Sequence, residues 1–290
     1  VLLFLIVVVF FSIERYLNAR YKFNYTPNTK KFKNEPPSFK NRIIIHLVCL
    51  IPIILGFLIP LLFIIDNVIY EFSRIDFIKV FNLTKNTVII SLISTFIIVV
   101  IAVYFQFLKR ILKNRTITFF NEFISLTYAL PGAVIGLSLI LLFTSYPFEN
   151  ELLIGSFGIL VYAYVIRYMA VGISPLKSSF DKHPSSYDDT AFNLGMGPTK
   201  LFRSIHLPIN KSAIAIAFLI TFVDIIKELP ITLILRPFNF DTLAVQTYEY
   251  AIEEMIPKSS IYSLAIVMLG TILLIFLKKL VNKEIDVPKS

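Results

Sequence analysis

The chain has 290 residues, of which 56% are hydrophobic and 16% are charged, and its mean hydropathy is +0.76. Soluble domains carry about a quarter charged residues, so this composition excludes an ordinary soluble protein and indicates a membrane protein. The net charge of +9 does not call for a nucleic-acid partner, because the basic residues gather in a few segments that alternate with apolar ones.

The N-terminal part predicts a truncated helix followed by a linker. Residues 1–13 are apolar but too short to cross a membrane, and no Lys or Arg precedes them and no small-residue cleavage site follows them, which argues against a signal peptide. Since no Met begins the chain, we interpret them as the end of a truncated transmembrane helix. Residues 14–42 carry eight Lys or Arg and the pair Pro36-Pro37, and predict a basic cytoplasmic linker. Two fused membrane units would give this arrangement, and an ordinary loop of one seven-helix unit is the alternative.

Six later stretches are long enough to cross a hydrocarbon core of about 30 Å. In lipid only a helix satisfies its own backbone hydrogen bonds without closing a barrel, so the predicted fold class is an all-α polytopic membrane protein. We expect six complete transmembrane helices within a domain of residues 43–280, followed by a cytoplasmic tail of residues 281–290. The stretches are Ile43–Ile65, Thr87–Phe107, Phe123–Tyr146, Leu152–Ile173, Ala213–Leu235 and Ile261–Leu277.

The distribution of basic residues predicts the orientation, because cytoplasmic loops are enriched in Lys and Arg. Residues 14–42, 108–122, 174–212 and 278–290 carry eight, four, five and four of them. The intervening segments 66–85, 146–151 and 224–260 carry three, none and three, and the last also holds six acidic residues. We therefore expect the 174–212 loop and the C-terminus to be cytoplasmic.

The third stretch contains Leu130-Pro131-Gly132. A proline inside a helix removes a hydrogen bond and usually bends the helix. Gly132, Ala133 and Gly136 would let a neighbouring helix approach closely. The bend either serves packing of the bundle or lies beside a translocation path.

A polar segment of residues 176–210 separates the fourth and fifth stretches, and its residues 183–208, here called the paired-helix loop, predict two short helices. Pro184 suits the first turn of one helix and Pro198 that of the other, Asp188 and Asp189 complement the first N-terminus, Gly195 breaks the pair, and Pro208 ends it. The first helix places an apolar stripe at spacings i, i+3, i+4 and i+7. This stripe packs either on the chain's own membrane domain or in the groove of a partner. Its residues are Tyr187, Thr190, Ala191 and Leu194.

Two acidic residues fall inside the fifth stretch. Asp224 would lie about 17 Å along the helix from Ala213, near the midplane, and Glu228 one turn further on the same face. Such charges face a cavity or a partner, so they line a path or are neutralised by Lys227 or Arg236. We expect Arg167 to extend to the cytoplasmic interface.

No Gly-rich phosphate-binding loop with Lys and Ser or Thr is present in the sequence, so we expect the chain not to hydrolyse ATP itself. His183 and Asp188 match the spacing of the His–Asp pair of a membrane acyltransferase, so an acyltransferase is one alternative hypothesis for the function. A passive channel or a secondary transporter, which needs no ATPase, is another.

The loop resembles the "EAA" loop of ABC-importer permeases of the binding-protein-dependent type. Asp189 and Thr190 stand where that family usually has Glu and Ala. The resemblance implies the type I importer fold, with this loop seated in a cytosolic ATPase whose closure on ATP moves the two permease halves. The other matching positions are Ala191, Gly195, Ile205, Leu207 and Pro208.

Residues 227–244 and 130–137 are similar to ferric-iron permeases, which are commonly fused pairs of six-helix halves. This resemblance implies import of ferric iron, although relatives for thiamine, sulfate and polyamines share the loop. Under it, Asp224 and Glu228 would act as transient oxygen ligands for a hard trivalent cation. Together with Pro230, Pro131 and Gly132 they are the expected path residues.

The same resemblance implies the partners and the location. The partners would be a cytosolic ABC ATPase dimer, a second permease half and a periplasmic or lipoprotein substrate-binding protein. The ATPase would use ATP and Mg²⁺, and this chain is expected to bind no cofactor. The implied location is the bacterial inner membrane.

Overall fold

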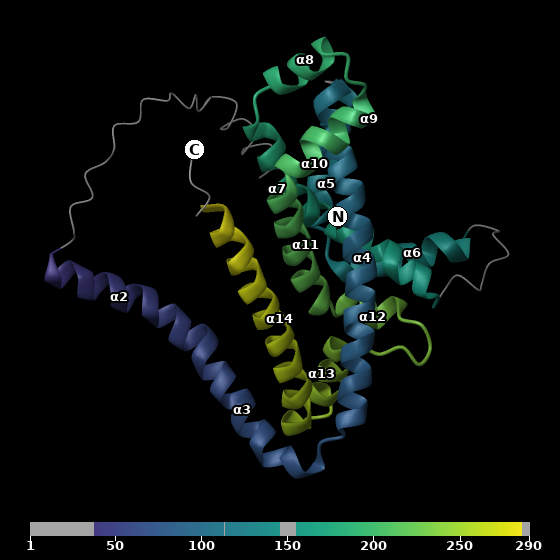
Figure 1. The fold of residues 1–290 in the computed structure, drawn as a ribbon. Helices are drawn as coiled ribbons and strands as arrows, with labels where there is room; N and C mark the ends of the chain where they lie inside the picture. Colours follow the sequence, from purple (N-terminus) through teal and green to yellow (C-terminus); the bar gives the residue numbers. More distant parts are fainter. Residues whose placement is uncertain (1–37, 113, 146–154, 286–290) are drawn as a thin grey trace.

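A computed structural model describes residues 38–112, 114–145 and 155–285, and the regular structure of these residues is helical throughout. The predicted all-α class is therefore confirmed for the described part of the chain (Figure 1). The α-helices are α2 Phe39–Ile53, α3 Ile59–Glu71, α4 Phe77–Leu112, α5 Arg115–Thr127, α6 Gly132–Ser145, α7 Phe157–Lys182, α8 Ser186–Asn193, α9 Pro198–Leu201, α10 Leu207–Ile209, α11 Lys211–Ile226, α12 Pro230–Leu235, α13 Leu243–Ile252 and α14 Ile256–Ile285.

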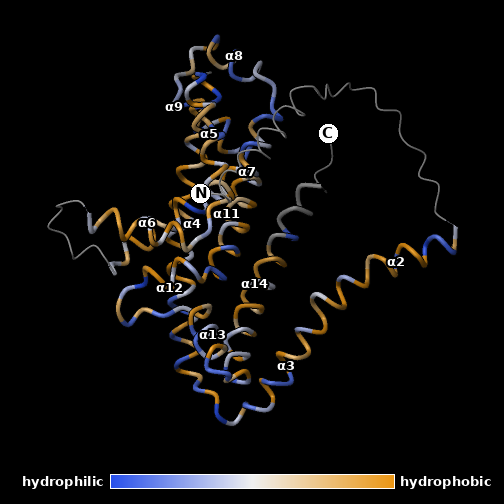
Figure 2. The backbone as a smooth tube through the Cα atoms, turned by 180° about the vertical axis from the view of Figure 1, so that it is seen from behind, coloured by the Kyte–Doolittle hydropathy of each residue, from blue (hydrophilic) through white to orange (hydrophobic). Residues whose placement is uncertain are grey.

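Helices α4, α7 and α11 form the centre of the bundle. A side chain at Gly172 of α7 would lie 2.7 Å from Ile98 of α4 and 3.6 Å from the Thr221 hydroxyl of α11, so glycine allows the three helices to meet closely. The long helices are apolar along most of their length, and the polar residues concentrate in the connections at the ends (Figure 2). The end that carries α8 and α9 is called the loop end below, and the end that carries α13 is called the opposite end.

Four helical segments are long and apolar enough to cross a membrane, and each of two bent helix pairs would add one crossing, which gives up to six. The predicted count of six thus matches the upper value. The four segments are Phe39–Arg74, Phe77–Leu112, Phe157–Lys182 and Ile256–Phe276.

Two helix ends differ from the predicted domain boundaries. Helix α2 begins at Phe39, so the last residues of the predicted linker 14–42 are helical, and α14 continues to Ile285, beyond the predicted boundary at residue 280. Residues 1–13, predicted as the end of a truncated helix, most of the predicted linker and residues 286–290 lie outside the described residues.

The third predicted span is wrong as a single helix. It divides into α5 and α6, whose axes differ by 110°, and α6 lies across the bundle instead of along it (Figure 1). Helix α5 ends at Thr127, before Pro131, which cannot donate the backbone hydrogen bond that would continue the helix. The predicted bend is therefore present, and it is much larger than an ordinary proline kink.

The fifth predicted span, Ala213–Leu235, is also interrupted. Helix α11 ends at Ile226, and α12 begins at Pro230, whose fixed φ suits a first helical turn. At the other end of α11, a bend of 70° separates it from the segment Pro198–Ile209. Two broken helices therefore flank α7 in the core.

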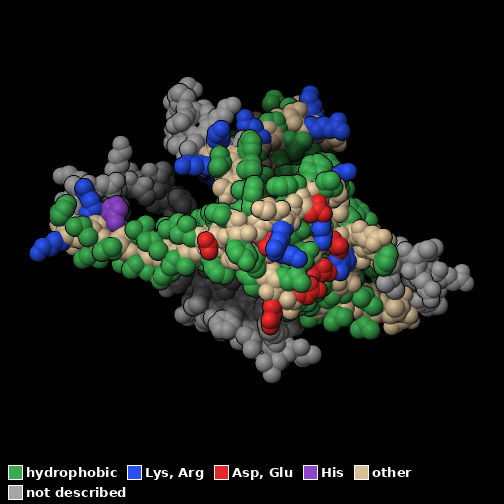
Figure 3. All heavy atoms as spheres, turned by 90° about the horizontal axis from the view of Figure 1, so that it is seen from below, with side chains coloured by type: hydrophobic (Ala, Val, Ile, Leu, Met, Phe, Trp, Pro, Cys, Tyr) green, Lys and Arg blue, Asp and Glu red, His purple; other side chains and the backbone are tan. Residues whose placement is uncertain are grey.

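Helices α2 and α3 lie apart from the rest of the bundle, in contact with it only near the opposite end, where α3 packs on α14 (Figure 1). No side chain in Phe39–Ile53 is buried. Seen from the opposite end, acidic and basic side chains gather in the middle of the surface, with apolar side chains along α2 and α3 (Figure 3). In the segment between α12 and α13 and in α13 itself, Arg236 pairs with Asp241 and, at 2.8 Å, with Glu249.

Candidate functional site

The paired-helix loop forms the two helices that its proline and glycine positions predict. The first, α8, begins at Ser186, two residues after the predicted Pro184. It ends in a Schellman motif, in which the Gly195 amide donates to the Phe192 carbonyl and the Met196 amide donates to the Ala191 carbonyl. Gly195 has a φ of +75°, a conformation that only glycine adopts at little cost.

The second helical segment begins at Pro198 and continues through a π-helical turn, Phe202–His206, to Ile209. Pro208 follows that turn, and the wider turn accommodates the proline ring and its missing amide hydrogen. Pro208 therefore does not end the helix as predicted, since the break falls at Asn210.

A groove of about 340 Å³ runs between the two helices on their outer side. It contains all four residues of the predicted apolar stripe, which confirms that they share one face. Leu194 is 76% exposed and Tyr187 is 48% exposed, so the groove opens outward. Its lining residues are Tyr187, Thr190, Ala191, Leu194, Met196, Ile205 and Ile209.

The inner side of the loop packs on the chain's own membrane helices. Ala191 and Leu201 are buried in a small apolar cluster with Phe107 of α4 and Phe180 of α7. The two hypotheses for the loop, packing on the chain's own membrane domain and binding to a partner, thus apply to different faces. One face is covered by the chain itself, and the other presents an exposed apolar groove.

The EAA-like residues divide between these faces. Asp189 and Thr190 are exposed on α8, whereas Ala191 is buried between the groove and the inner cluster and contributes to both. Ile205 is half-buried in the groove. Leu207 is half-buried and Pro208 is exposed on the second segment.

Arg110, in the last turn of α4, holds the loop against the bundle, and sequence reasoning missed it. Its guanidinium donates to the carbonyls of Phe180 at 2.6 Å, His183 at 3.0 Å and Pro184 at 2.7 Å. Its Nε donates to Asp188 Oδ2 at 2.6 Å. The only sequence signal for this role of Arg110 is its position at the predicted end of a helix, close to a loop.

His206 completes this arrangement. Its Nε2 lies 2.8 Å from Asp188 Oδ1, and its ring stacks on Phe180. Burial lowers the pKa of His206, and the nearby Arg110 lowers it further, although Asp188 opposes both effects. Because a carboxylate oxygen only accepts, Nε2 of His206 donates to Asp188.

These contacts do not support the acyltransferase hypothesis, which requires His183 and Asp188 to act as a pair. Asp188 is occupied by Arg110 and His206, and no hydrogen bond joins His183 to Asp188 among the described residues. The His183 ring instead lies beside Tyr187.

A second polar cluster lies where the two broken helices meet α7. Arg167 donates to the Leu130 carbonyl at 2.6 Å, beside the α5–α6 break, and lies 3.5 Å from Glu228, beside the α11–α12 break. Tyr168 donates to the same carboxylate. A side chain at Gly132 would come within 2.8 Å of Glu228 Oε1, so this glycine lets the two breaks approach each other.

These contacts correct two expectations. Arg167 does not extend to the cytoplasmic interface, because α7 continues for fifteen residues beyond it to Lys182 and its guanidinium is bound to Leu130 and Glu228. Asp224 and Glu228 do not share a helix face, because α11 ends between them at Ile226. Glu228 is almost fully buried, and its Oε1 accepts from the Ile231 amide at the start of α12.

Asp224 pairs with Lys227 at 2.8 Å, as the alternative interpretation proposed. The described residues contain no group of three or more His, Cys, Asp or Glu that could hold a metal ion. Pro131 and Pro230 mark the two helix breaks, next to Gly132 and Glu228.

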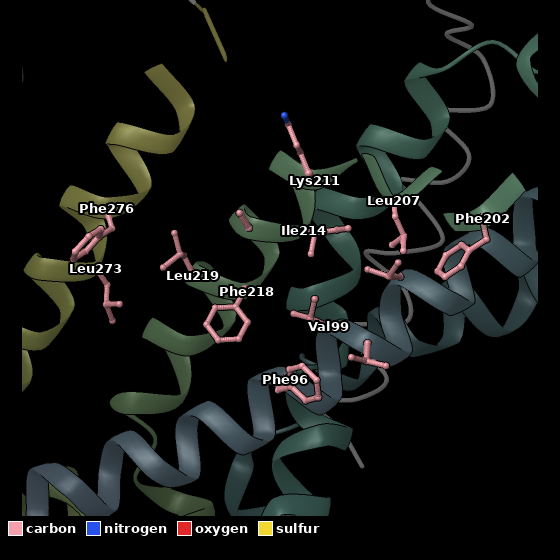
Figure 4. Close-up of a pocket in the computed structure, with 13 residues that line it drawn as sticks. Phe96, Val99, Phe202, Leu207, Lys211, Ile214, Phe218, Leu219, Leu273 and Phe276 are labelled. Atoms are coloured by element: carbon pink, nitrogen blue, oxygen red, sulfur yellow. The ribbon is translucent and has the colours of Figure 1, made fainter. Parts of the chain in front are cut away.

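A cavity of about 730 Å³ lies between α4, α11 and α14 (Figure 4). Its lining is apolar except for Lys211, whose ammonium group points away at one edge (Figure 4). It therefore offers no oxygen ligands to a metal ion. Four of its lining residues are phenylalanines, namely Phe96, Phe202, Phe218 and Phe276.

Substitution of Gly195 by Ala is expected to destabilise the loop by about 1–2 kcal/mol, because an L-residue at this φ brings its Cβ against the backbone. Gly197 is the matched control. It has a φ of −74°, and a side chain there would meet nothing within 4 Å, so Gly197→Ala should be neutral. Limited proteolysis in detergent measures the cleavage rate of the loop in each variant. Equal cleavage rates for the two variants would contradict the proposed role of Gly195.

Comparison with known proteins adds to this geometry. The family model described as "Binding-protein-dependent transport system inner membrane component" matches residues 112–287, which include the paired-helix loop and both helix breaks. The chain is also similar to the Fe(3+)-transport system permease protein FbpB 2 of Haemophilus influenzae, with 26% identity over 204 residues. That alignment covers 70% of this chain and 40% of the relative.

The maltose/maltodextrin transport system permease protein MalG is similar over a shorter region. The Escherichia coli K12 protein is 32% identical over 94 residues, and the Photorhabdus laumondii protein is 31% identical over 94 residues. The alignments cover 32% of this chain and 31% of each relative. The chain thus aligns with less than half the length of each of these relatives.

Proposed function

We propose that this chain, which belongs to the family of binding-protein-dependent transport system inner membrane components, forms half of the membrane path of an ATP-driven importer. The observation that carries the proposal is the paired-helix loop, whose outer groove is apolar and exposed although its inner face is packed. An exposed apolar groove on a rigid element is typical of a surface that a partner covers.

The proposed partner of the groove is a separate ATP-hydrolysing subunit. The exposed carboxylate of Asp189 lies at the N-terminal end of α8, beside the groove, so an apolar contact with a charged rim is available. In this proposal the motor occurs as a dimer that uses ATP and Mg²⁺, with one subunit docked on each permease half. In this proposal the partner hydrolyses ATP, and this chain changes conformation without catalysing a reaction.

The remaining partners follow from the same proposal. A second permease half, fused upstream or separate, completes the path. A substrate-binding protein docks on the opposite end, where the charged surface of Figure 3 lies. The loop end, with residues 108–122, 174–212 and the end of α14, is then cytoplasmic.

The proposed substrate is ferric iron. Support comes from the similarity to the ferric-iron permease over 70% of the chain, compared with 32% for the maltose permeases. Asp224 remains the candidate path residue, since its side chain is 18% exposed. Glu228, with a side chain 4% exposed, braces the two helix breaks in this conformation.

An uptake assay tests the substrate. In a strain that lacks its own iron, thiamine, sulfate, polyamine and maltodextrin permeases, expression of the full transporter should restore uptake of radioactive ferric iron alone. An ATPase subunit whose phosphate-binding Lys is replaced by Ala is the control and should abolish the uptake. Restoration of any other substrate instead of iron would overturn this assignment, and uptake that persists with the disabled ATPase would favour a channel or secondary transporter.

A further inference from the structure

We propose that Arg110 is the positioning residue that makes the paired-helix loop and the membrane helices α4 and α7 move as one body. This inference rests on the proposed function, because it concerns how movement of the loop reaches the membrane path. It assigns the task to a residue that contacts neither the outer groove nor the membrane path.

The first observation is the number of bonds that Arg110 makes to the end of α7. The last carbonyls of a helix have no partner within the helix. Arg110 donates to three carbonyls in and after the last turn of α7, those of Phe180, His183 and Pro184. A planar guanidinium reaches several acceptors in fixed directions, which a lysine ammonium does not. The end of α4 is thus fixed to the end of α7 where the loop begins.

The second observation is the bond to the loop itself. Only Asp188 and Ala191 of α8 are buried. Ala191 joins the buried apolar cluster with Phe107 and Phe180, a contact without fixed direction, whereas Asp188 forms a charge-assisted hydrogen bond with Arg110 at 2.6 Å. Through its other oxygen Asp188 reaches His206 on the second helical segment. One arginine therefore connects both loop helices to α4.

The third observation is that α4 passes the connection into the membrane. One turn before Arg110, Gln106 donates to Asn121 of α5 at 2.6 Å, and both side chains are buried. Helix α5 leads to the break at Leu130, whose carbonyl binds Arg167. Polar contacts joined by the helices α4 and α5 thus extend from the loop to the helix breaks, and such chains of side-chain contacts and rigid helices can carry coupling.

The test uses the complete transporter in liposomes, with its ATPase and substrate-binding protein, and measures substrate imported per ATP hydrolysed. Arg110→Gln should retain the ATPase, since the groove is unchanged, and should lower the import per ATP about fivefold or more. Arg110→Lys should not restore it. Asp188→Asn should give a similar loss, and the double variant should be no worse than either single one.

Lys109→Gln is the matched control. It removes a positive charge from the same helix end, where Lys109 lies 4.0 Å from an exposed Asp181, and it should leave import per ATP unchanged. If Arg110→Gln does not accumulate as a folded protein, Asp188→Asn, which preserves the side-chain shape, decides the question.

Three results would overturn the inference: normal import per ATP in Arg110→Gln and Asp188→Asn, additive losses in the double variant, or an equal loss in Lys109→Gln. If the unmodified transporter shows no ATP-dependent import, the proposed function itself fails. The two failures are therefore distinguishable.

Discussion

Replacing Arg167 by Met is expected to lower the free energy of unfolding by about 3–5 kcal/mol, because it leaves the carboxylate of Glu228 buried without its charge partner. The Glu228 side chain is 4% exposed and that of Arg167 is 18% exposed, so water can do little to replace the lost charge partner of Glu228. The Leu130 carbonyl also loses its donor. Unfolding in mixed detergent micelles, followed by circular dichroism, measures the change.

Lys227→Gln is the control for this experiment. It breaks a neighbouring pair of the same charge type, Lys227–Asp224 at 2.8 Å, but the Lys227 side chain is 63% exposed. Exposed pairs contribute about 0–1 kcal/mol, so this variant should remain near the original stability. Adding Glu228→Gln to Arg167→Met should recover part of the loss. A cost for Arg167→Met as small as that of Lys227→Gln would show that the cluster does not brace the helix breaks.

Substitution of Leu194 by Asp is expected to remove the ATPase from the purified complex and to abolish ATP-dependent import. The Leu194 side chain is 76% exposed, so the fold itself should lose no more than about 0.5 kcal/mol. A charge placed at the centre of an apolar contact typically costs at least about 2 kcal/mol of binding, which weakens binding about 30-fold. Co-purification of the ATPase with tagged permease measures the loss.

Asn193→Asp is the matched control, because it adds the same charge one residue away. Asn193 is exposed and does not line the groove. This variant should keep most of the ATPase. Retention of the ATPase by Leu194→Asp at the control level would contradict the assignment of the groove as its docking surface.

Sequence periodicity and local signals predict the features of this fold that are determined by neighbouring residues in the chain. Long apolar runs predict α4, α7 and α14, because a membrane helix must satisfy its backbone within its own segment. Likewise Gly195 predicts the break in the loop, because a glycine at a helix end supplies the left-handed residue of the Schellman motif. The four-residue stripe of the groove follows from helical spacing alone.

Sequence reasoning fails where the cause is a contact between distant segments. Arg110 and Asp188 are 78 residues apart in the chain, and Tyr168 and Glu228 are 60 apart, so no local pattern reveals either cluster. Pro131 signals a helix break, but the partner of the Leu130 carbonyl at the 110° bend is Arg167, 37 residues away. Helical spacing also places Glu228 on the face of Asp224, whereas α11 ends at Ile226 and α12 begins only at Pro230.

The most direct test of the account is site-specific crosslinking from the groove. Cys49 is the only cysteine in the chain, so a Cys49→Ser background allows one new cysteine at Leu194, labelled with a photoreactive group, in membranes that contain all subunits of the transporter. We expect this position to crosslink to the ATP-hydrolysing subunit and a cysteine at Leu137, exposed on α6, not to do so. If the Leu194 probe forms no crosslink to that subunit, or forms it no more than the Leu137 probe, the groove is not the docking surface of the ATPase.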